Sequence, residues 1–224
     1  MANIFPRGSN LLPIKLVICG MVLVPAVTGA MWYYFTPKYT RVGYQPAQPV
    51  PFPHDIHAGQ LGMDCRYCHS FVEVAAHSNV PTTQVCMNCH AQVQKENPKL
   101  APLWESWKTG KSIEWVQIHK TPDYVYFNHS AHVNRGVSCV SCHGRVDKMA
   151  VVYHAEPQSM DWCLECHRHP EQALRPLDQI TNLGWSPPLA GDQSRADAQE
   201  ALGLQLKKDW KINPPDMNCA GCHR

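Results

Sequence analysis

Cysteine and histidine are the residues of this 224-residue sequence whose spacing most clearly indicates chemistry. The chain contains 11 Cys and 13 His, and ten of the cysteines form five C-x-x-C-H patterns. In such a pattern two thiols can add to the vinyl groups of one porphyrin, and the adjacent histidine can bind its iron. The spacing therefore predicts five covalently attached c-type haems, held by Cys65, Cys68 and His69; Cys86, Cys89 and His90; Cys139, Cys142 and His143; Cys163, Cys166 and His167; and Cys219, Cys222 and His223.

Three other uses of paired cysteines fit the sequence less well. Structural zinc sites also use C-x-x-C pairs, but zinc does not require a histidine after every second cysteine. A disulfide framework gives the five histidines no role. A thioredoxin-type redox motif would occur once, near an alternating strand and helix pattern. Haem attachment is the interpretation that uses every one of these residues.

The remaining histidines decide whether each iron keeps an open coordination position. An iron with two strong axial ligands is suited to electron transfer, whereas an open iron can bind small molecules. Eight histidines remain besides the five that end the motifs, which is enough for every iron. We expect His169 to lie at the surface and no residue to be catalytic. The expected distal ligands are His54, His57, His77, His129 and His132, with His119, His154 and Met160 as alternatives.

The distal candidates belong to an internal repeat. An F-x-H-x-x-H segment precedes the first C-x-x-C-H motif in residues 52–92 and again in residues 127–169. His77 and His154 each lie nine residues before the next motif cysteine. This agreement predicts a duplicated two-haem unit, in which one segment could supply ligands to two irons. The fifth motif, at 219–223, follows a long stretch without such motifs.

An apolar segment precedes all of these motifs. Leu16 to Phe35 contains no charged side chain. As a helix it would span roughly 30 Å, the thickness of the hydrocarbon core of a bilayer. Aromatic residues cluster at its C-terminal end, as at a membrane interface. We predict a membrane anchor, and the alternative is a signal peptide cleaved near Ala30. The eleventh cysteine, Cys19, lies inside this segment, where we expect it to act as a small apolar residue.

The fold class follows from these elements and from the composition. Phe is scarce, with 5 residues, and Pro is abundant, with 19, so haems would replace much of an apolar core. We expect a mostly α-helical chain with little regular secondary structure, in which a multihaem cytochrome c domain wraps five haems. The predicted organisation is an N-terminal anchor helix (1–36), a Pro-rich linker (37–53) and the haem domain (54–224). Within that domain, we expect short helices to carry the C-x-x-C-H motifs, and helices are predicted over 84–95, 100–109 and 195–209.

Charge and haem chemistry restrict the partners and the location. The net charge of +2 lacks the basic excess that nucleic-acid-binding proteins show, so no nucleic acid is expected. In bacteria c-type haem is attached outside the cytoplasm. We therefore expect a cytoplasmic N-terminus, a single span surrounded by lipid in the inner membrane, and a haem domain in the periplasm.

Two stretches carry a resemblance to a known family. An anchor followed by F-x-H-x-x-H repeats and C-x-x-C-H motifs resembles class III multihaem cytochromes. Residues 115–132 (WVQIHKTPDYVYFNHSAH) and 159–168 (SMDWCLECHR) are more specifically similar to the pentahaem subunit, ActA, of bacterial alternative complex III. The resemblance covers nearly the whole chain, including the anchor and all five motifs.

This resemblance implies an electron-transfer relay subunit of a membrane complex that oxidises quinol. In that family the pentahaem subunit relays electrons from an iron–sulfur subunit toward a periplasmic cytochrome or an oxygen reductase. The implied partners are thus an iron–sulfur subunit, polytopic quinol-binding membrane subunits and a downstream acceptor. The alternative is a stand-alone membrane-anchored quinol dehydrogenase of the NapC/NrfH type. A pentahaem nitrite reductase is disfavoured, because those enzymes use a C-x-x-C-K site and all five motifs here end in histidine.

Overall fold

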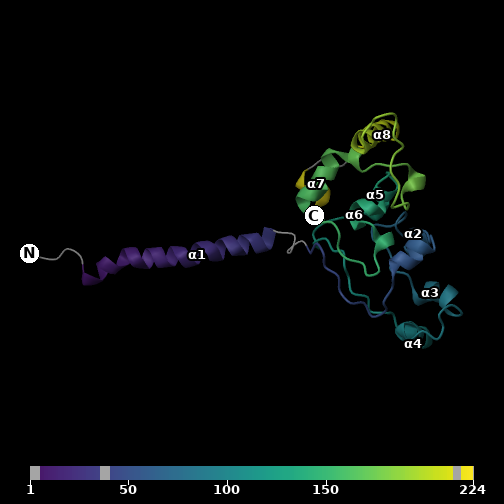
Figure 1. Ribbon diagram of the computed structural model, residues 1–224, viewed down its shortest axis with the longest axis horizontal. Helices are drawn as coiled ribbons and strands as arrows, with labels where there is room; N and C mark the ends of the chain where they lie inside the picture. The colour runs from purple at the N-terminus through teal and green to yellow at the C-terminus, as the bar shows by residue number, and fades with distance from the viewer. Residues whose placement is uncertain (1–5, 36–40, 214–217, 224) are drawn as a thin grey trace, which may run out of the picture. The chain divides into compact units, whose positions relative to one another are not determined.

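The computed structural model describes residues 6–35, 41–213 and 218–223. The chain divides into two compact units, residues 1–42 and residues 43–224, which are treated separately here (Figure 1). The end of the predicted anchor and the start of the predicted linker, residues 36–40, lie outside the described residues. The rest of the linker, residues 41–53, contains no helix, as its high proline content predicts.

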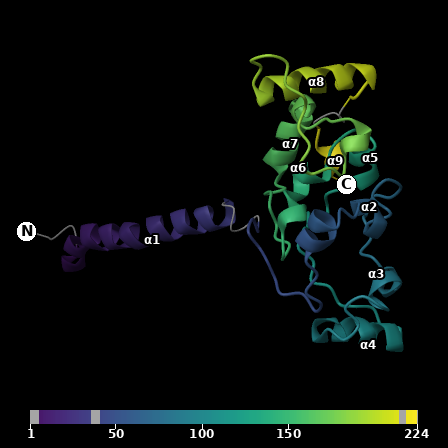
Figure 2. The same ribbon diagram turned by 45° about the vertical axis from the view of Figure 1, so that its right-hand side comes forward.

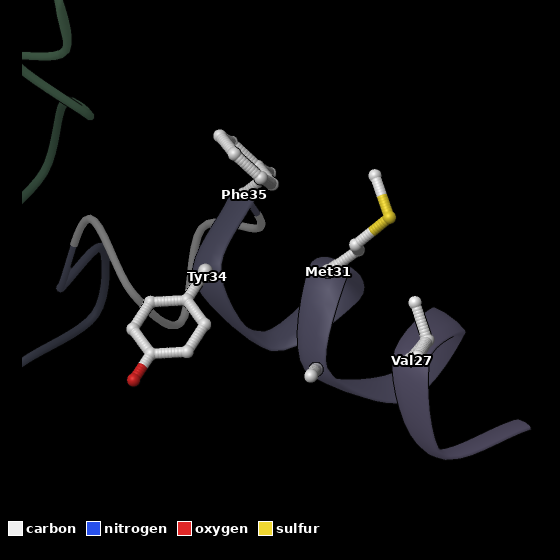
Figure 3. A pocket seen from close by; sticks show the side chains of 5 residues that line it. Val27, Met31, Tyr34 and Phe35 are labelled. Carbon is white, nitrogen blue, oxygen red and sulfur yellow. The ribbon is translucent and has the colours of Figure 1, made fainter. Parts of the chain in front are cut away.

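The first unit is one apolar helix. A 3₁₀ turn, η1 (Arg7–Leu11), leads into α1 (Leu12–Phe35), none of whose side chains is buried. Val27, Met31 and Phe35 lie along one side of its last turns, and Tyr34 points to another (Figure 3). Length and composition would allow this helix to cross a membrane.

The second unit consists of short helices joined by long irregular segments. Its described residues form no β-strand, and pair only in two isolated antiparallel bridges, Val125 with His223 and Val137 with Leu174. The predicted mostly helical fold with little regular structure is confirmed. The helical elements are η2 (Asp55–Gln60, a π-helical turn), α2 (Cys65–Cys68), α3 (Thr83–His90), η3 (Pro98–Leu100), α4 (Ala101–Thr109), α5 (His129–Val133), α6 (Cys139–His143), η4 (Val146–Lys148), α7 (Met160–Arg168), η5 (Pro170–Gln172), η6 (Leu177–Gln179), α8 (Arg195–Asp209) and α9 (Cys219–Cys222).

These elements are arranged along one direction of the unit. Helices α3 and α4 lie at one end and α8 lies at the other, with α2, α6 and α7 between them (Figures 1 and 2). At the α8 end, Gly203 lies directly against the backbone of Glu171, so that a Cβ at this position would collide with it. Lys207 of α8 also pairs with the Glu171 carboxylate at 3.1 Å. The close approach of α8 to η5 therefore depends on a residue without a side chain.

Three helices follow the sequence-based predictions to different degrees. The predicted helix at 100–109 is found as α4, and Gly110 ends it in the left-handed conformation at φ 72°. The helix predicted at 195–209 is found over the same residues as α8. The helix predicted at 84–95 ends earlier, at His90. Turns follow it, and Gln94 adopts φ 58°, which an α-helix cannot accommodate.

Few apolar side chains are shielded from solvent in the second unit. The described buried ones are Val50, Met87, Leu103, Met149, Leu174, Ile180, Leu183, Ala198 and Leu206. Large apolar side chains are exposed in the motif helix α2, at Tyr67, and just after it, at Phe71 and Val74. A chain of this length normally buries a larger apolar core. The polypeptide alone therefore does not complete the interior of this unit.

Candidate haem-binding sites

Each C-x-x-C-H motif begins on a helix that starts at a capping residue. We number the motifs along the chain as site 1 (Cys65–His69), site 2 (Cys86–His90), site 3 (Cys139–His143), site 4 (Cys163–His167) and site 5 (Cys219–His223). The residues before the helices are of the types that favour helix starts: Asp64, Thr82, Ser138, Ser159 and Asn218. The expectation that short helices carry the motifs is confirmed. Their two cysteines, three residues apart, lie on the same side of one helical turn.

The cysteines of the five motifs are all unpaired thiols in the structure. Eight are half-buried, and Cys89 and Cys219 are exposed. Burial is the main cause that raises the pKa of Cys142 to about 12, so this thiol is neutral. The exposed or half-buried position of each pair leaves both sulfur atoms accessible for thioether formation.

Three motif histidines have their Nδ1 atoms bound to backbone carbonyls. The Nδ1 of His69 lies 2.8 Å from the Asn79 oxygen, and that of His90 lies 3.0 Å from the Val93 oxygen. The Nδ1 of His223 lies 3.4 Å from the oxygen of Tyr124. An Nδ1–H that donates to a carbonyl fixes the tautomer and directs the lone pair of Nε2 toward a metal. These histidines are therefore oriented as metal ligands.

The two F-x-H-x-x-H segments fold in the same way. The Phe52 ring stacks on His57 at 4.2 Å and meets the edge of His54 at 4.7 Å. The Phe127 ring stacks on His132 at 4.5 Å and meets the edge of His129 at 4.7 Å. One phenylalanine thus holds two imidazoles in each segment, and its two contacts have the stacked and edge-to-face forms that aromatic rings prefer.

Carbonyl groups also orient the histidines of these segments. The Nδ1 of His57 lies 2.9 Å from the Pro53 oxygen, and that of His132 lies 2.7 Å from the Asn128 oxygen. Each carbonyl lies four residues upstream of the histidine it binds, at matching positions of the two blocks. The Nδ1 of His129 lies 2.9 Å from the oxygen of Ala76, in the first block. As in the motif histidines, Nε2 is left for a metal.

Ring spacings test whether these histidines fit a haem iron. A histidine nitrogen binds a metal at about 2 Å and the ring centre lies roughly 1 Å beyond, so two imidazoles sharing one iron have centres about 6 Å apart. His57 and His90 are 6.2 Å apart, and His132 and His167 are also 6.2 Å apart.

His129 and His143 give a third pair, at 6.4 Å with nearly parallel rings. All three pairs join an F-x-H-x-x-H histidine to a motif histidine of its own block. The residues therefore fit an iron coordinated by two histidines at sites 2, 3 and 4.

His54 lies near the motif histidine of site 1. Burial, followed by nearby His69 and His57, lowers the pKa of His54 to about 4. Its Nδ1 is buried without a hydrogen-bond partner. A buried polar nitrogen without a hydrogen bond is unfavourable, and a metal ion bound to the neutral imidazole would offset that cost.

A second group of histidines surrounds His143 of site 3. His119 meets its ring edge at 4.4 Å, and His119 lies 5.1 Å from His154. Burial, followed by His119 and other histidines, lowers the pKa of His143 to about 3. His154 is 1% exposed, and both of its ring nitrogens are without partners, as is Nε2 of His119. The 4.4 Å spacing is too short for two ligands of one iron, so His119 packs against His143 instead.

Site 5 has different surroundings. Among the described residues, the ring of His223 contacts the ring of Tyr124 at 5.5 Å and contacts no histidine ring. The Tyr126 N–H donates to the Cys222 oxygen at 2.9 Å, which ties this motif to the start of the second block. The structure therefore does not bring any of the predicted distal histidines to site 5.

The remaining predicted ligands lie at the surface. His77 is exposed in the loop after site 1, and Met160 is 63% exposed at the start of α7. His169, predicted to lie at the surface, is about half exposed, and its Nδ1 lies 3.3 Å from a Glu171 carboxylate oxygen. A carboxylate partner and this exposure distinguish it from the carbonyl-bound histidines.

Asn79 is a site residue that sequence patterns did not indicate. Its backbone oxygen binds His69, and its side-chain amide donates to the Cys68 oxygen at 3.1 Å. Its Oδ1 accepts the Phe71 N–H at 2.9 Å. Asn79 thus closes the loop behind the site 1 histidine. No spacing rule marks it, because the contact depends on how the loop turns back.

Comparisons with known proteins agree with this chemistry. Residues 50–109 match the family model described as cytochrome c7 and related cytochrome c. The chain is 34% identical over 122 residues to the menaquinone reductase multiheme cytochrome c subunit of Nitratidesulfovibrio vulgaris, covering 54% of this chain and 55% of that protein. It is 23% identical over 228 residues to cytochrome c-552 of Maridesulfovibrio salexigens, covering 80% of this chain and 44% of that protein.

The chain thus spans about half the length of the curated relatives it matches. The family match covers sites 1 and 2, where the fold has already placed the paired histidines His57 and His90. The chain is thus similar to c-type cytochromes over sites 1 and 2 and to the multiheme cytochrome c subunit of a menaquinone reductase over about half its length.

Proposed function

We propose that this chain is the relay subunit of a membrane complex that oxidises quinol, of the alternative complex III type. It would pass electrons from an iron–sulfur subunit through five c-type haems to a periplasmic cytochrome or a terminal oxidase. The chain itself would carry out no bond chemistry, so we assign it no catalytic residue.

The observation that carries this proposal is the matched spacing of the two blocks. His57 with His90 and His132 with His167 both lie at 6.2 Å, in two segments separated by 75 residues in the sequence. Two histidines that bind the same iron leave it no free position for a substrate. A duplicated arrangement of this kind therefore favours electron transfer over catalysis.

We assign the axial ligands from the same contacts. The motif histidines His69, His90, His143, His167 and His223 would bind the five irons on one side. His54, His57, His129 and His132 would bind on the other side at sites 1 to 4. A haem iron held in this way supplies one-electron transfer between its ferrous and ferric states. For site 5 the candidates from the sequence are His77, His119, His154 and Met160, of which His119 and His154 lie beside site 3 instead.

The membrane anchor and the partners follow from α1 and from the relative. The homologous protein is named as a subunit of a menaquinone reductase, which is a membrane-associated function. One anchor helix has too little surface to enclose a quinone by itself, so we propose polytopic membrane subunits beside it. The haem unit would face the periplasm, where c-type haem is attached.

Purification of the tagged full chain in mild detergent tests the proposed assembly. We expect an iron–sulfur subunit and polytopic membrane subunits to co-purify, and the assembled complex to oxidise quinol. A parallel purification from cells with the untagged chain identifies background proteins. A chain that purifies alone and oxidises quinol would instead favour the stand-alone quinol dehydrogenase.

Mass spectrometry of the denatured chain tests the number of haems independently. We expect a mass increase that corresponds to five covalently attached haems. The thioether bonds survive denaturation, so zinc or non-covalent haem would leave the mass of the bare chain. Fewer than five haems on the full-length chain would contradict the proposed cofactor content.

A further inference from the structure

We propose that the five sites form a single row in the order 2, 1, 3, 4, 5, so that electrons travel in an order that differs from the sequence. This inference rests on the proposed relay function and specifies its route. The ends of the row are then site 2 (Cys86–His90) and site 5 (Cys219–His223). Site 1, the first motif of the sequence, is an interior site.

Sites 2 and 1 are joined directly. Asn88, inside the site 2 motif, donates to the hydroxyl of Tyr67, inside the site 1 motif, at 3.2 Å. The segment that carries His54 and His57 also reaches both sites. The first two motifs are thus adjacent in space as well as in sequence.

Site 1 adjoins site 3, although 74 residues separate Cys65 from Cys139. The capping residues of the two motif helices are hydrogen-bonded to one segment. Thr181 donates to the Asp64 carboxylate at 2.8 Å, and Ser138 donates to the Ile180 oxygen at 2.6 Å. The segment at 180–181 therefore holds α2 and α6 together.

This link between α2 and α6 joins the first block to the second through sites 1 and 3, not through site 2. If the sites were arranged as they occur in the sequence, site 2 would lie between sites 1 and 3. Instead α3 lies with α4 toward the end of the unit opposite α8, and α2 lies between α3 and α6 (Figure 2).

Site 3 adjoins site 4 within the second block. Gln158, just before α7, donates to the Cys142 oxygen at 3.2 Å. His129 and His132, one turn apart on α5, pair with His143 and His167 respectively. One short helix therefore supplies ligands to both sites.

Site 5 adjoins site 4 at the other end of the row. Helix α9 of site 5 lies beside α7 of site 4 (Figure 2). The hydrogen bond of the Tyr126 N–H to the Cys222 oxygen and the bridge from Val125 to His223 fix this motif against the segment just before the second block. Site 5 therefore extends the row beyond site 4.

Marking one haem at a time with a methionine ligand tests the order. Methionine in place of a distal histidine raises the potential of that haem and gives it a far-red absorption band. The marked haem is reduced first, and its added electron shifts the midpoint potentials of other haems. The shift is largest for adjacent haems, because charge interactions weaken with distance. We would introduce H57M at site 2 and H54M at site 1 in the full chain, and follow each haem by redox titration with NMR.

We expect H57M to shift the midpoint of one other haem and H54M to shift two. Sequence order predicts the reverse, so two shifted neighbours for H57M and one for H54M would overturn the proposal. The control variant H169M, at an exposed histidine bound to Glu171, should shift none. If methionine does not bind the iron, H57A and H54A raise the same potentials and give the same pattern. Failure to co-purify partner subunits would disprove the assembly proposal without changing this result.

Discussion

The two blocks of this molecule are the same ligand scaffold built twice, with one systematic difference. In each block one phenylalanine holds two histidines, and the second histidine lies 6.2 Å from the histidine of the second motif. These contacts agree to within a few tenths of an ångström. Such agreement is expected if the two histidines of each pair bind one metal ion, because metal–ligand distances vary little.

The difference lies in the third histidine of each block. His77 and His154 occupy the same position in the repeat, nine residues before a motif cysteine. His154 is 1% exposed and lies beside His119, whereas His77 is exposed. His119 comes from the segment between the blocks, and no ring among the described residues packs against His77 in the same way. A position in a repeat therefore predicts a role only where the neighbours are repeated too.

The largest expected effect is loss of a distal ligand. H57A and H132A should each leave one iron open, and the reduced proteins should bind one more carbon monoxide per chain than the parent protein. Titration with carbon monoxide, followed by the Soret band, measures this. H169A is the matched control and should bind no more than the parent. If only one of the two variants gains a binding site, the blocks are not equivalent at their irons.

Removal of the phenylalanine that holds each pair should have the next largest effect. F52A and F127A each lose two ring contacts, and we expect each to reduce the free energy of unfolding by about 2 kcal/mol. Both rings are half-buried, so the loss should be smaller than for a buried core phenylalanine. Denaturant unfolding monitored through haem absorbance measures both variants. Losses that differ by more than about 1 kcal/mol would contradict the equivalence of the two segments.

The third histidines should respond unequally. H154A creates a cavity in a buried site, and we expect it to cost about 2 kcal/mol of unfolding free energy. H77A changes an exposed side chain and should cost less than about 0.5 kcal/mol. The same denaturant experiment compares them. An equally large loss from H77A, together with added binding of carbon monoxide, would instead make His77 the sixth ligand of site 5.

The sequence was sufficient to predict the features that depend on local spacing. The C-x-x-C-H pattern lies within one or two turns, so it predicted the helices at the motifs. The helix at 195–209 was predicted with its observed bounds, and Ser194 caps its start. The helix predicted over 84–95 was too long, because no rule indicated the left-handed conformation of Gln94.

Contacts between distant segments could not be predicted in this way. The backbone carbonyls of Asn79 and Ala76 orient His69 and His129, but any residue type has a carbonyl group. Their role depends only on the path of the loop at 70–80. The hydrogen bonds of Thr181 to Asp64 and of Ser138 to the Ile180 oxygen likewise join motifs that the sequence keeps apart, so spacing alone gives no order for the sites.

The smallest expected effects concern Asp64 and Ser138. Asp64 caps the start of α2 with a carboxylate, and Ser138 caps the start of α6 with a hydroxyl. Asp64 accepts the Arg66 N–H at 2.8 Å, and Ser138 accepts the Val140 N–H at 3.4 Å. S138A should cost about 1 kcal/mol of unfolding free energy, because the Ile180 oxygen also loses its buried donor. This loss should be the same at every pH, since a serine hydroxyl does not titrate in this range.

Asp64 should instead make stability depend on pH. Its hydrogen bond with the Arg66 side chain holds the pKa of the Asp64 carboxyl far below its usual range. A lowered pKa in the folded state means that the stabilisation is complete above about pH 4, near the pKa of an unfolded aspartate, and is lost as pH falls further. D64N should therefore be less stable than the parent near neutral pH by about 0.5 kcal/mol, since the group is largely exposed, and the difference should shrink toward pH 3. Denaturant unfolding at both pH values measures it, with S138A as the pH-independent control. A D64N difference that stays constant on acidification would show that the two caps are equivalent and that the carboxylate charge contributes nothing.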